Sequence, residues 1–308
     1  MKINIRILVF LFLYASSSNA MLLDIEIPYF KSKGIIEQKE VKSNKLFKLI
    51  DLKIAIIEPS TKDSTTVKAH YFKNAKGGKK PLLIIAPPIG GISIREKSVS
   101  KYFLRKGFNV IVVEPIKNIS DNSIAIIEFE NNLLSFIGAI RSVVDVMEEL
   151  PEIQKDNIFI WASSMGAIYS SIVIEIDSRI NASILILGAG SIPDIMTESN
   201  QKHIVNYRTE RMFKENLNSI EEFRAKMRSN IEVDPIMHAN KNQSSKVFFV
   251  MSTKDKTVPT KYQQQLYESL GSPPNIKRYK SNHAITLMRS HLFGLNTFYK
   301  YIESNIKR

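Results

Sequence analysis

The sequence predicts an α/β protein built on a mostly parallel sheet with helices on both faces. From residue 81 onward, short apolar runs of strand length alternate with amphipathic stretches of helical period. Strands separated by helices imply parallel pairing. The run 81–86 is apolar at nearly every position, which suits a strand buried on both faces. With 308 residues, the chain has room for one large domain of this kind or for two small ones.

The first twenty residues predict a secretory signal peptide, residues 1–20. Lys2 and Arg6 precede the apolar run 7–15, and small residues follow up to Ala20, which is the order found in signal peptides. A membrane anchor is the alternative, but the apolar run falls well short of the ~20 residues that span a bilayer. We therefore expect cleavage after Ala20, a mature domain over residues 21–308 that is exported (periplasmic or secreted), and no stable membrane anchor.

Composition excludes some functions. The formal net charge is +13, but the lysines are spread along the chain without an arginine-rich block or interleaved aromatic residues, so we expect no nucleic-acid partner. The chain has no cysteine, which excludes disulfides and thiolate chemistry.

The elements expected before the first buried strand are antiparallel. Residues 22–29 alternate in part, and segments 48–59 and 65–72 indicate a hairpin around a polar stretch. After strand 81–86 the pattern predicts, in order, helix 98–106, strand 109–113, helix 129–150, strands 157–161, 184–187, 247–251 and 276–279, and a terminal helix 287–302.

Residues 191–245 interrupt this alternation. The segment is polar and mainly helical in pattern, for example over 210–227, and it is too long for a simple connection. We expect a small helical cap or lid inserted between strands of the sheet. Ordinary peripheral helices are the alternative.

Strand 157–161 runs into a group of small residues, Ala162-Ser163-Ser164-Met165-Gly166, and then into a helical pattern. Strand, sharp turn and helix form the context of a nucleophilic serine. Such a turn strains the backbone, so the neighbouring residues must be small. Ser164 is therefore the candidate nucleophile, although Ala162 stands where the G-x-S-x-G pattern has its first glycine. A plain strand-to-helix turn is the alternative.

A nucleophilic serine needs a general base, and in an open parallel sheet the base should follow the carboxyl end of a strand. If the base comes last along the chain, as in one known order of the triad, His283 and His291 remain of the five histidines. His283 is expected in a loop directly after strand 276–279. His291 falls inside the predicted terminal helix, so His283 is the candidate base.

The base in turn needs an acid that orients it. Asp255 follows strand 247–251 and precedes Val258-Pro259, where the proline suits the first turn of a helix. Asp234 is the second candidate, but it precedes that strand and so stands at the wrong edge of the sheet. Asp255 is the candidate acid.

Acyl transfer also requires backbone N–H donors where negative charge develops. The first donor expected is the amide of Met165, at the start of the helix after the serine. The second should come from the loop 87–91, Pro-Pro-Ile-Gly-Gly. Because proline has no N–H, Ile89 is the preferred donor and Gly90 the next. A glycine-rich turn without this role is the alternative.

These features occur in order along the chain, each just after a predicted strand, and here the sequence resembles the α/β-hydrolase superfamily. It is most similar to serine esterases and to dienelactone-hydrolase-like and prolyl-oligopeptidase-like hydrolases, over residues 45–305. The motifs that carry the resemblance are PPIGG at 87–91, ASSMG at 162–166, TKDKTVP at 253–259 and SNHA at 281–284. The chain departs from the pattern at Ala162 and has no HGGG motif.

The resemblance implies an α/β-hydrolase fold with Ser164 as nucleophile, His283 as base and Asp255 as acid, and with Met165 and Ile89 as oxyanion donors. We expect a serine hydrolase that cleaves carboxylic esters through an acyl-enzyme, with a small-molecule ester as partner and with no metal or organic cofactor. A peptidase or a lactone hydrolase with the same triad remains open, and so does a noncatalytic binding protein on the same fold.

Overall fold

The computed structural model describes residues 27–28, 30–57, 64–89, 91–114 and 121–308. The predicted signal peptide, residues 1–20, lies outside the described residues. So does most of the predicted strand 22–29.

Over the described residues, the strands form one nine-stranded sheet in the order β1-β2-β3-β5-β4-β6-β7-β8-β9. The first three strands pair antiparallel, and β3 pairs antiparallel with β5. All other pairs are parallel. The bounds are β1 Lys31–Ser43, β2 Phe47–Ile57, β3 Ser64–Asn74, β4 Lys80–Ala86, β5 Asn109–Val113, β6 Ile153–Ser163, β7 Ile180–Ile186, β8 Val247–Ser252 and β9 Asn275–Tyr279.

Alternate side chains of the central strands enter two separate cores. In β4, Leu82 and Ile84 pack on one face of the sheet, whereas Leu83 and Ile85 pack on the other. The first face is covered by α2 (Ile126–Glu148), α3 (Met165–Ile176) and α8 (Thr260–Ser269), and the second by α1 (Ile94–Arg105), α9 (His283–Phe293) and α10 (Leu295–Ser304). Strands buried on both faces explain the continuous apolar runs of the sequence.

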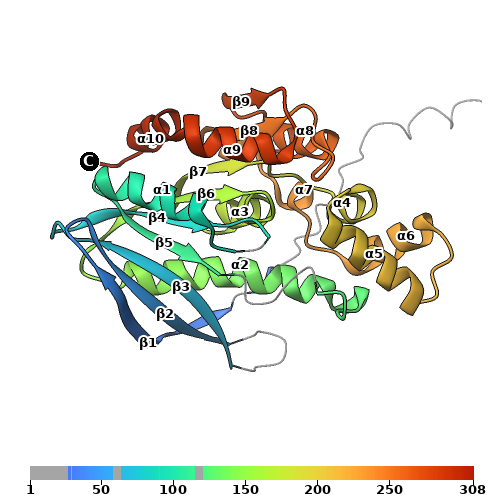
Figure 1. Cartoon of the computed structure of the whole chain (residues 1–308), viewed down its shortest axis with the longest axis horizontal. Helices are drawn as coiled ribbons and strands as arrows, with labels where there is room; N and C mark the ends of the chain where they lie inside the picture. The colour runs from blue at the N-terminus through green and yellow to red at the C-terminus, as the bar shows by residue number, and fades with distance from the viewer. Residues whose placement is uncertain (1–26, 29, 58–63, 90, 115–120) are drawn as a thin grey trace, which may run out of the picture.

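The C-terminal region contains two helices where the sequence predicts one over 287–302 (Figure 1). The chain turns at Gly294, where a Cβ atom would lie 2.2 Å from the Phe298 ring and 2.6 Å from the Ser290 carbonyl oxygen. Only glycine fits this close packing. The helix α9 also begins earlier than predicted, because Asn282 caps it and accepts a hydrogen bond from the Ile285 N–H at 3.0 Å.

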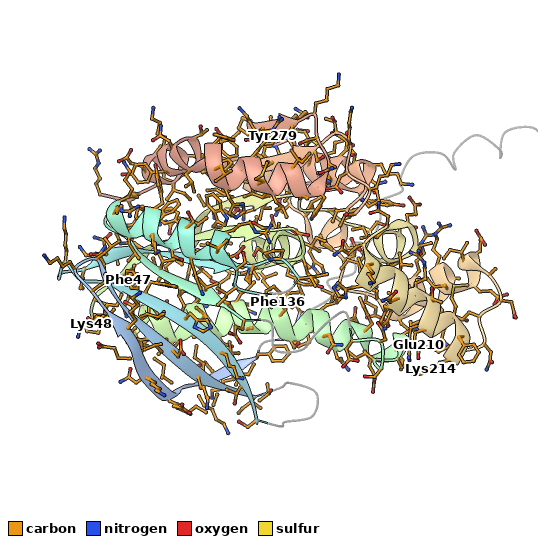
Figure 2. All side chains as sticks on the ribbon, in the orientation of Figure 1. Phe47, Lys48, Phe136, Glu210, Lys214 and Tyr279 are labelled. Carbon is orange, nitrogen blue, oxygen red and sulfur yellow. The ribbon has the colours of Figure 1, made fainter. Side chains whose placement is uncertain are left out.

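Between β7 and β8 the chain forms α4 (Ile192–Glu198), α5 (Lys202–Lys214), α6 (Ile220–Asn230), α7 (Pro235–His238) and the 3-10 helix η1 (Lys241–Lys246). Helices α4, α5 and α6 stand together at one end of the molecule, on the right in Figure 1. Figure 2 places Glu210 and Lys214 of α5 at the outer surface of this group, and Phe136 of α2 in the interior. The helical stretch predicted over 210–227 is broken at residues 215–219, because Ser219 begins a new helix and caps it.

Candidate active site

The backbone at Ser164 is strained. Ser164 has φ +53° and ψ −120°, between the end of β6 and the start of α3. A positive φ is costly for a residue other than glycine and persists only where the surroundings enforce it. Here the Ser164 N–H donates a hydrogen bond to the Ile186 carbonyl oxygen at 2.7 Å, which ties the turn to the neighbouring strand β7. The sharp turn expected from the sequence is present.

The residue requirements of the turn follow from close packing. A Cβ atom on Gly166 would lie 2.2 Å from the Ala86 carbonyl oxygen, so any side chain there would push α3 away from the end of β4. Ala162 is fully buried in β6 and pairs with Ala86 and Leu185 in the sheet. Its methyl group lies in the core on the face of the sheet that α2 and α3 cover.

Asp255 lies beyond the end of β8 and is held on both carboxylate oxygens. Its Oδ1 accepts hydrogen bonds from the N–H groups of Thr257 at 2.8 Å and Val258 at 3.0 Å. Its Oδ2 lies 2.7 Å from His283 Nδ1 and accepts from Gln263 Nε2 at 3.0 Å. The Asp255 side chain is 0% exposed, so these contacts replace the water that it loses on burial.

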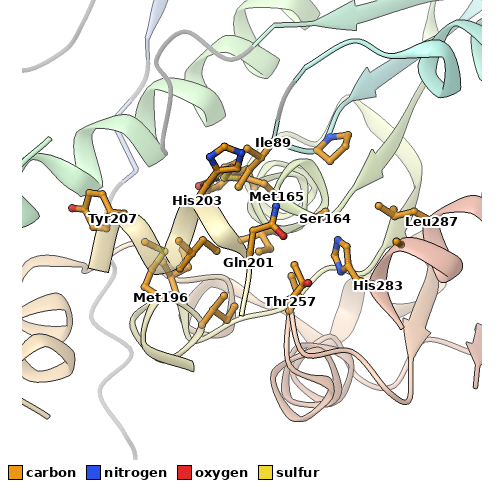
Figure 3. A pocket seen from close by; sticks show the side chains of 18 of the residues that line it. Ile89, Ser164, Met165, Met196, Gln201, His203, Tyr207, Thr257, His283 and Leu287 are labelled. Atoms are coloured by element: carbon orange, nitrogen blue, oxygen red, sulfur yellow. Dashed lines mark hydrogen bonds between the residues drawn. The ribbon is translucent and has the colours of Figure 1, made fainter. Parts of the chain in front are cut away.

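His283 is the first residue of α9, not a loop residue as the sequence suggested. An ionised carboxylate can only accept hydrogen bonds, so the bond to Asp255 places a proton on His283 Nδ1 and leaves Nε2 for the pocket. His283 and Ser164 line the same pocket, and Figure 3 shows them next to each other in its wall. Within the described residues, the Ser164 hydroxyl makes no hydrogen bond to this ring, a contact that often closes only with substrate bound.

The pocket has a volume of about 290 Å³ and is mainly apolar. It extends from Ser164 to Phe129 of α2 and Tyr207 of α5, whose ring centroids lie 5.4 Å apart. The lining residues are Pro88, Ile89, Arg95, Phe129, Ser164, Met165, Ile168, Tyr169, Ile192, Ile195, Met196, Gln201, His203, Ile204, Tyr207, Thr257, Val258, His283, Ala284 and Leu287.

The expected oxyanion donors lie on the same wall. Met165 begins α3 directly after Ser164, where the N–H groups of the first helical turn point outward. Ile89 follows β4 and also lines the pocket, and Figure 3 shows Ile89 and Met165 on the side of Ser164. Gly90, the other donor considered, lies outside the described residues.

The alternative acid and base have structural roles. Asp234 accepts hydrogen bonds from the N–H groups of Ser191 at 2.8 Å, Ile192 at 2.6 Å and Ile236 at 3.0 Å, so it caps the starts of α4 and α7. His291 is buried against Trp161, and its Nδ1 donates to the Leu287 carbonyl oxygen at 2.7 Å. Burial lowers the pKa of His291.

Sequence reasoning missed several residues of the site. Gln201 and His203, at the start of α5, line the pocket from the segment between β7 and β8, and Arg95 of α1 lines it from another side. Gln263 of α8 does not line the pocket but donates a hydrogen bond to Asp255 Oδ2. None of them belongs to a motif, and the only available signal was the polar insertion 191–245 that carries two of them.

No group of three or more His, Asp or Glu side chains is placed to hold a metal ion within the described part of the chain. In the same part of the chain, every helix is too short or too polar to cross a bilayer.

Comparison by sequence finds no matching family model and no matching curated protein. Comparison of structures finds an acetyl xylan esterase from Paenibacillus sp. R4, with 12% identity, TM-score 0.64 and coverage of 93% of this chain and 92% of that one. Acetyl xylan esterase 1 from Thermoanaerobacterium sp. JW/SL YS485 has 16% identity, TM-score 0.62 and coverage of 89% and 88%. A putative dienelactone hydrolase from Klebsiella pneumoniae subsp. pneumoniae MGH 78578 has 12% identity, TM-score 0.53 and coverage of 77% and 93%.

At these identities the likeness shows the fold. The chain has the α/β-hydrolase fold, with a mostly parallel sheet and helices on both faces. The fold class predicted from the sequence is confirmed.

Proposed function

We propose that the protein is a serine hydrolase that cleaves carboxylic esters through an acyl-enzyme. The observation that carries the proposal is the Asp255–His283 hydrogen bond, 2.7 Å long, beside a pocket that Ser164 also lines. An aspartate that orients a histidine, next to a serine on a strained turn, is the arrangement that activates a hydroxyl for acyl transfer.

In the first half of the reaction, Ser164 Oγ attacks the ester carbonyl carbon while His283 Nε2 takes the hydroxyl proton. Asp255 keeps the ring oriented and stabilises the imidazolium that forms. The carbonyl oxygen becomes negative and accepts hydrogen bonds from the amides of Met165 and Ile89. The intermediate collapses, His283 gives its proton to the leaving alcohol oxygen, and the acyl group stays on Ser164.

In the second half, His283 Nε2 takes a proton from a water molecule, whose oxygen attacks the acyl carbon. The intermediate collapses again, the Ser164 oxygen regains its proton from His283, and the carboxylic acid leaves. Besides the ester and one water molecule, the steps use side chains and amides of this chain.

The pocket supports an ester with an apolar acyl group. Its lining is mainly aliphatic and aromatic, and its far end lies between Phe129 and Tyr207. A volume of about 290 Å³ holds a group considerably larger than acetyl, although two proteins of similar structure carry the name acetyl xylan esterase. We further propose that residues 191–245 act as a cap, since α4 and α5 supply one wall of the pocket.

Hydrolysis of p-nitrophenyl esters, from acetyl to octanoyl, tests the proposal. Replacing Ser164→Ala should lower kcat by at least ~1000-fold, because the nucleophile is lost while binding remains. The adjacent Ser163→Ala in β6 is the matched control and should keep kcat within about threefold. Equal rates for the wild type and Ser164→Ala would remove Ser164 from the mechanism.

Two further experiments distinguish ester hydrolysis from the other functions that the sequence left open. Peptide, amide and lactone substrates run beside the esters would reveal a peptidase or a lactone hydrolase that uses the same triad. A serine-directed fluorophosphonate probe should label the wild type and not Ser164→Ala. A noncatalytic binding protein would not label at all.

We also propose export, on the sequence of residues 1–20 alone. Expressed in a bacterium with its natural N-terminus, the protein should accumulate outside the cytoplasm with Met21 as its first residue. N-terminal sequencing that begins at Met1 would contradict this proposal.

A further inference from the structure

The helix α9 exposes apolar residues and buries polar ones. Its outward side chains include Ile285, Met288, Leu292 and Phe293, of which Leu292 is 62% and Phe293 77% exposed. These positions recur at helical spacing and form one stripe. A surface helix normally turns such a stripe toward the core. A stripe this exposed marks a surface that contacts something apolar.

The inward face of α9 accounts for this orientation. Thr286, Ser290 and His291 are buried there, and the two hydroxyls and His291 Nδ1 are hydrogen-bonded. The Thr286 and Ser281 hydroxyls lie 2.8 Å apart, and Ser290 Oγ donates to the Thr286 carbonyl oxygen at 2.8 Å. Rotating the helix to bury its apolar stripe would expose this face and break the contact with Ser281, so the stripe stays outside.

The neighbouring helix α1 continues the same surface. It packs beside α9 on the same face of the sheet, as Figure 1 shows. Ile94 at its start is 83% exposed, and Lys97, Lys101 and Arg105 follow it on the outward side. The single acid of α1, Glu96, is buried.

The outward faces of these two helices therefore combine apolar side chains with cations. Arg289 adds a cation on α9, and neither outward face carries a carboxylate. We name this surface the basic apolar face. It consists of Ile94, Lys97, Lys101 and Arg105 of α1 and of Ile285, Met288, Arg289, Leu292 and Phe293 of α9.

We propose that the basic apolar face docks the protein on an anionic lipid surface. Apolar side chains on such a face enter the boundary between head groups and acyl chains, and the flanking cations attract anionic head groups. A second copy of this chain fits poorly, because Lys97, Lys101 and Arg289 of one copy would oppose the same cations of the other. Without Lys2 and Arg6 of the predicted signal peptide, the formal net charge of +13 falls only to 13 − 2 = +11, which also favours an anionic partner.

The position of the face suggests what docking does. The helix α9 begins at His283, and its next residues Ala284 and Leu287 line the pocket. The lipid boundary would thus lie against the helix that carries the candidate base. Docking is a property of the surface and holds whether or not Ser164 is the nucleophile.

Because the chain has no cysteine, a single introduced thiol can carry an environment-sensitive fluorophore. The test uses Leu292→Cys on the face and, as matched control, Phe213→Cys on α5, where the side chain is 81% exposed. Vesicles of equal parts phosphatidylcholine and phosphatidylglycerol should shift the emission of the label at position 292 to the blue. Pure phosphatidylcholine vesicles should not, and the label at position 213 should stay unchanged with either.

A charge test complements the label. In the labelled Leu292→Cys protein, Lys97→Glu with Lys101→Glu should weaken the affinity for the mixed vesicles by at least about tenfold. The same charge change at Lys39 and Lys42 on the exposed strand β1 should weaken it much less. The Ser164→Ala variant should bind as the wild type does, which separates docking from the proposed chemistry.

Several results would overturn the proposal. The face does not contact lipid if vesicles leave the emission of the label at position 292 unchanged, or if they shift the emission of the label at position 213 equally. Equal losses of vesicle affinity in the two charge variants would contradict the proposal in the same way. A shift that grows with protein concentration without vesicles would assign the face to a second copy. A full shift with polyaspartate alone would assign it to an acidic protein surface.

Discussion

Gln263 shows how much a residue outside any motif contributes to the site. Its Nε2 donates to Asp255 Oδ2 at 3.0 Å, and its Oε1 accepts from the Ser252 N–H at 3.0 Å. It thus connects the acid to the end of β8. In the proposed reaction Gln263 would act only through Asp255, so it is a positioning residue.

Replacing Gln263→Met should lower kcat by about tenfold with little change in KM, because the carboxylate loses a donor that fixes its orientation. It should also lower the free energy of unfolding by roughly 1–3 kcal/mol, since the buried Ser252 N–H loses its acceptor. Steady-state kinetics and urea unfolding measure the two effects separately. The exposed Gln265→Met is the control. An unchanged kcat for Gln263→Met would show that the contacts of Asp255 with Thr257, Val258 and His283 are enough to hold it.

Glu175 predicts a dependence of stability on pH. Burial raises the pKa of Glu175 to about 7, and the backbone of Asn240 and the charge of Lys246 only partly oppose this. The folded protein therefore binds an extra proton between the ordinary value of 4.5 and about 7. The free energy of unfolding falls as the pH rises through this window.

Replacing Glu175→Gln removes the charge that folding must bury. Because the group is partly exposed, the variant should gain on the order of 1 kcal/mol over the wild type near pH 8 and nothing near pH 4. Urea unfolding at both pH values measures this. Glu221→Gln, on the exposed first turn of α6, should show no such difference, and parallel pH curves for Glu175→Gln and the wild type would refute the argument.

The three candidate catalytic residues were identified from the sequence because each follows a predicted strand. In the structure Ser164 and His283 line one pocket, and Asp255 is hydrogen-bonded to the His283 ring. Gln201, His203 and Gln263 gave no comparable signal. Their positions depend on how α5 and α8 pack against the rest of the molecule, and no local sequence pattern records that packing.

Among the elements, α5 sets the shape of the pocket. Arg208 anchors it, because Nη1 donates to the carbonyl oxygens of Met196 at 3.0 Å, Thr197 at 2.6 Å and Ser199 at 3.3 Å, at the end of α4. With the helix fixed in this way, Ile204 and Tyr207 face the pocket. A larger residue at position 204 should therefore fill the pocket instead of displacing the helix.

Replacing Ile204→Trp should lower kcat/KM for the octanoyl ester by about tenfold or more and change it less than about threefold for the acetyl ester. The reason is that only the longer acyl chain reaches past α5. The neighbouring Val205→Trp, which does not line the pocket, is the control. Equal losses on both esters would mean that the acyl group lies elsewhere.

The boundaries of elements were harder to predict than their existence. N-cap residues set these boundaries. Asn282 caps α9, which begins four residues before the predicted helix 287–302, and Ser219 caps α6 in the middle of the predicted helix 210–227. The strand β1 was not singled out, because its side chains are mostly exposed on both faces and leave no alternation to detect.

At the scale of the whole molecule, the sequence predicted the class of sheet because buried parallel strands and amphipathic helices have distinct periods. The order of the strands was not predictable. It depends on which helices cross which face, and the pairing of β3 with β5 joins the antiparallel hairpin to the parallel strands. Contacts made from the turns between elements also hold the helices together.

Arg179 makes such a contact and gives the last prediction. Its guanidinium lies 2.8 Å from Asp145 Oδ1 and 3.0 Å from Glu148 Oε1 on α2, and 2.6 Å from Asp177 Oδ2 at the end of α3. Burial works to raise the pKa of Asp177, but the bonds from Arg179 outweigh it and hold that pKa below its ordinary value.

Replacing Arg179→Met leaves Asp177 buried without its main partner and should lower the free energy of unfolding by about 3 kcal/mol at neutral pH. The loss should shrink as acid protonates Asp177, because the wild type then loses the same stabilisation. Chemical unfolding at several pH values measures both effects. The exposed pair of Lys214 with Glu210 at 2.8 Å supplies the control, since Lys214→Met should leave the free energy of unfolding nearly unchanged. If both variants cost the same, the Arg179 contacts contribute no more than a surface ion pair.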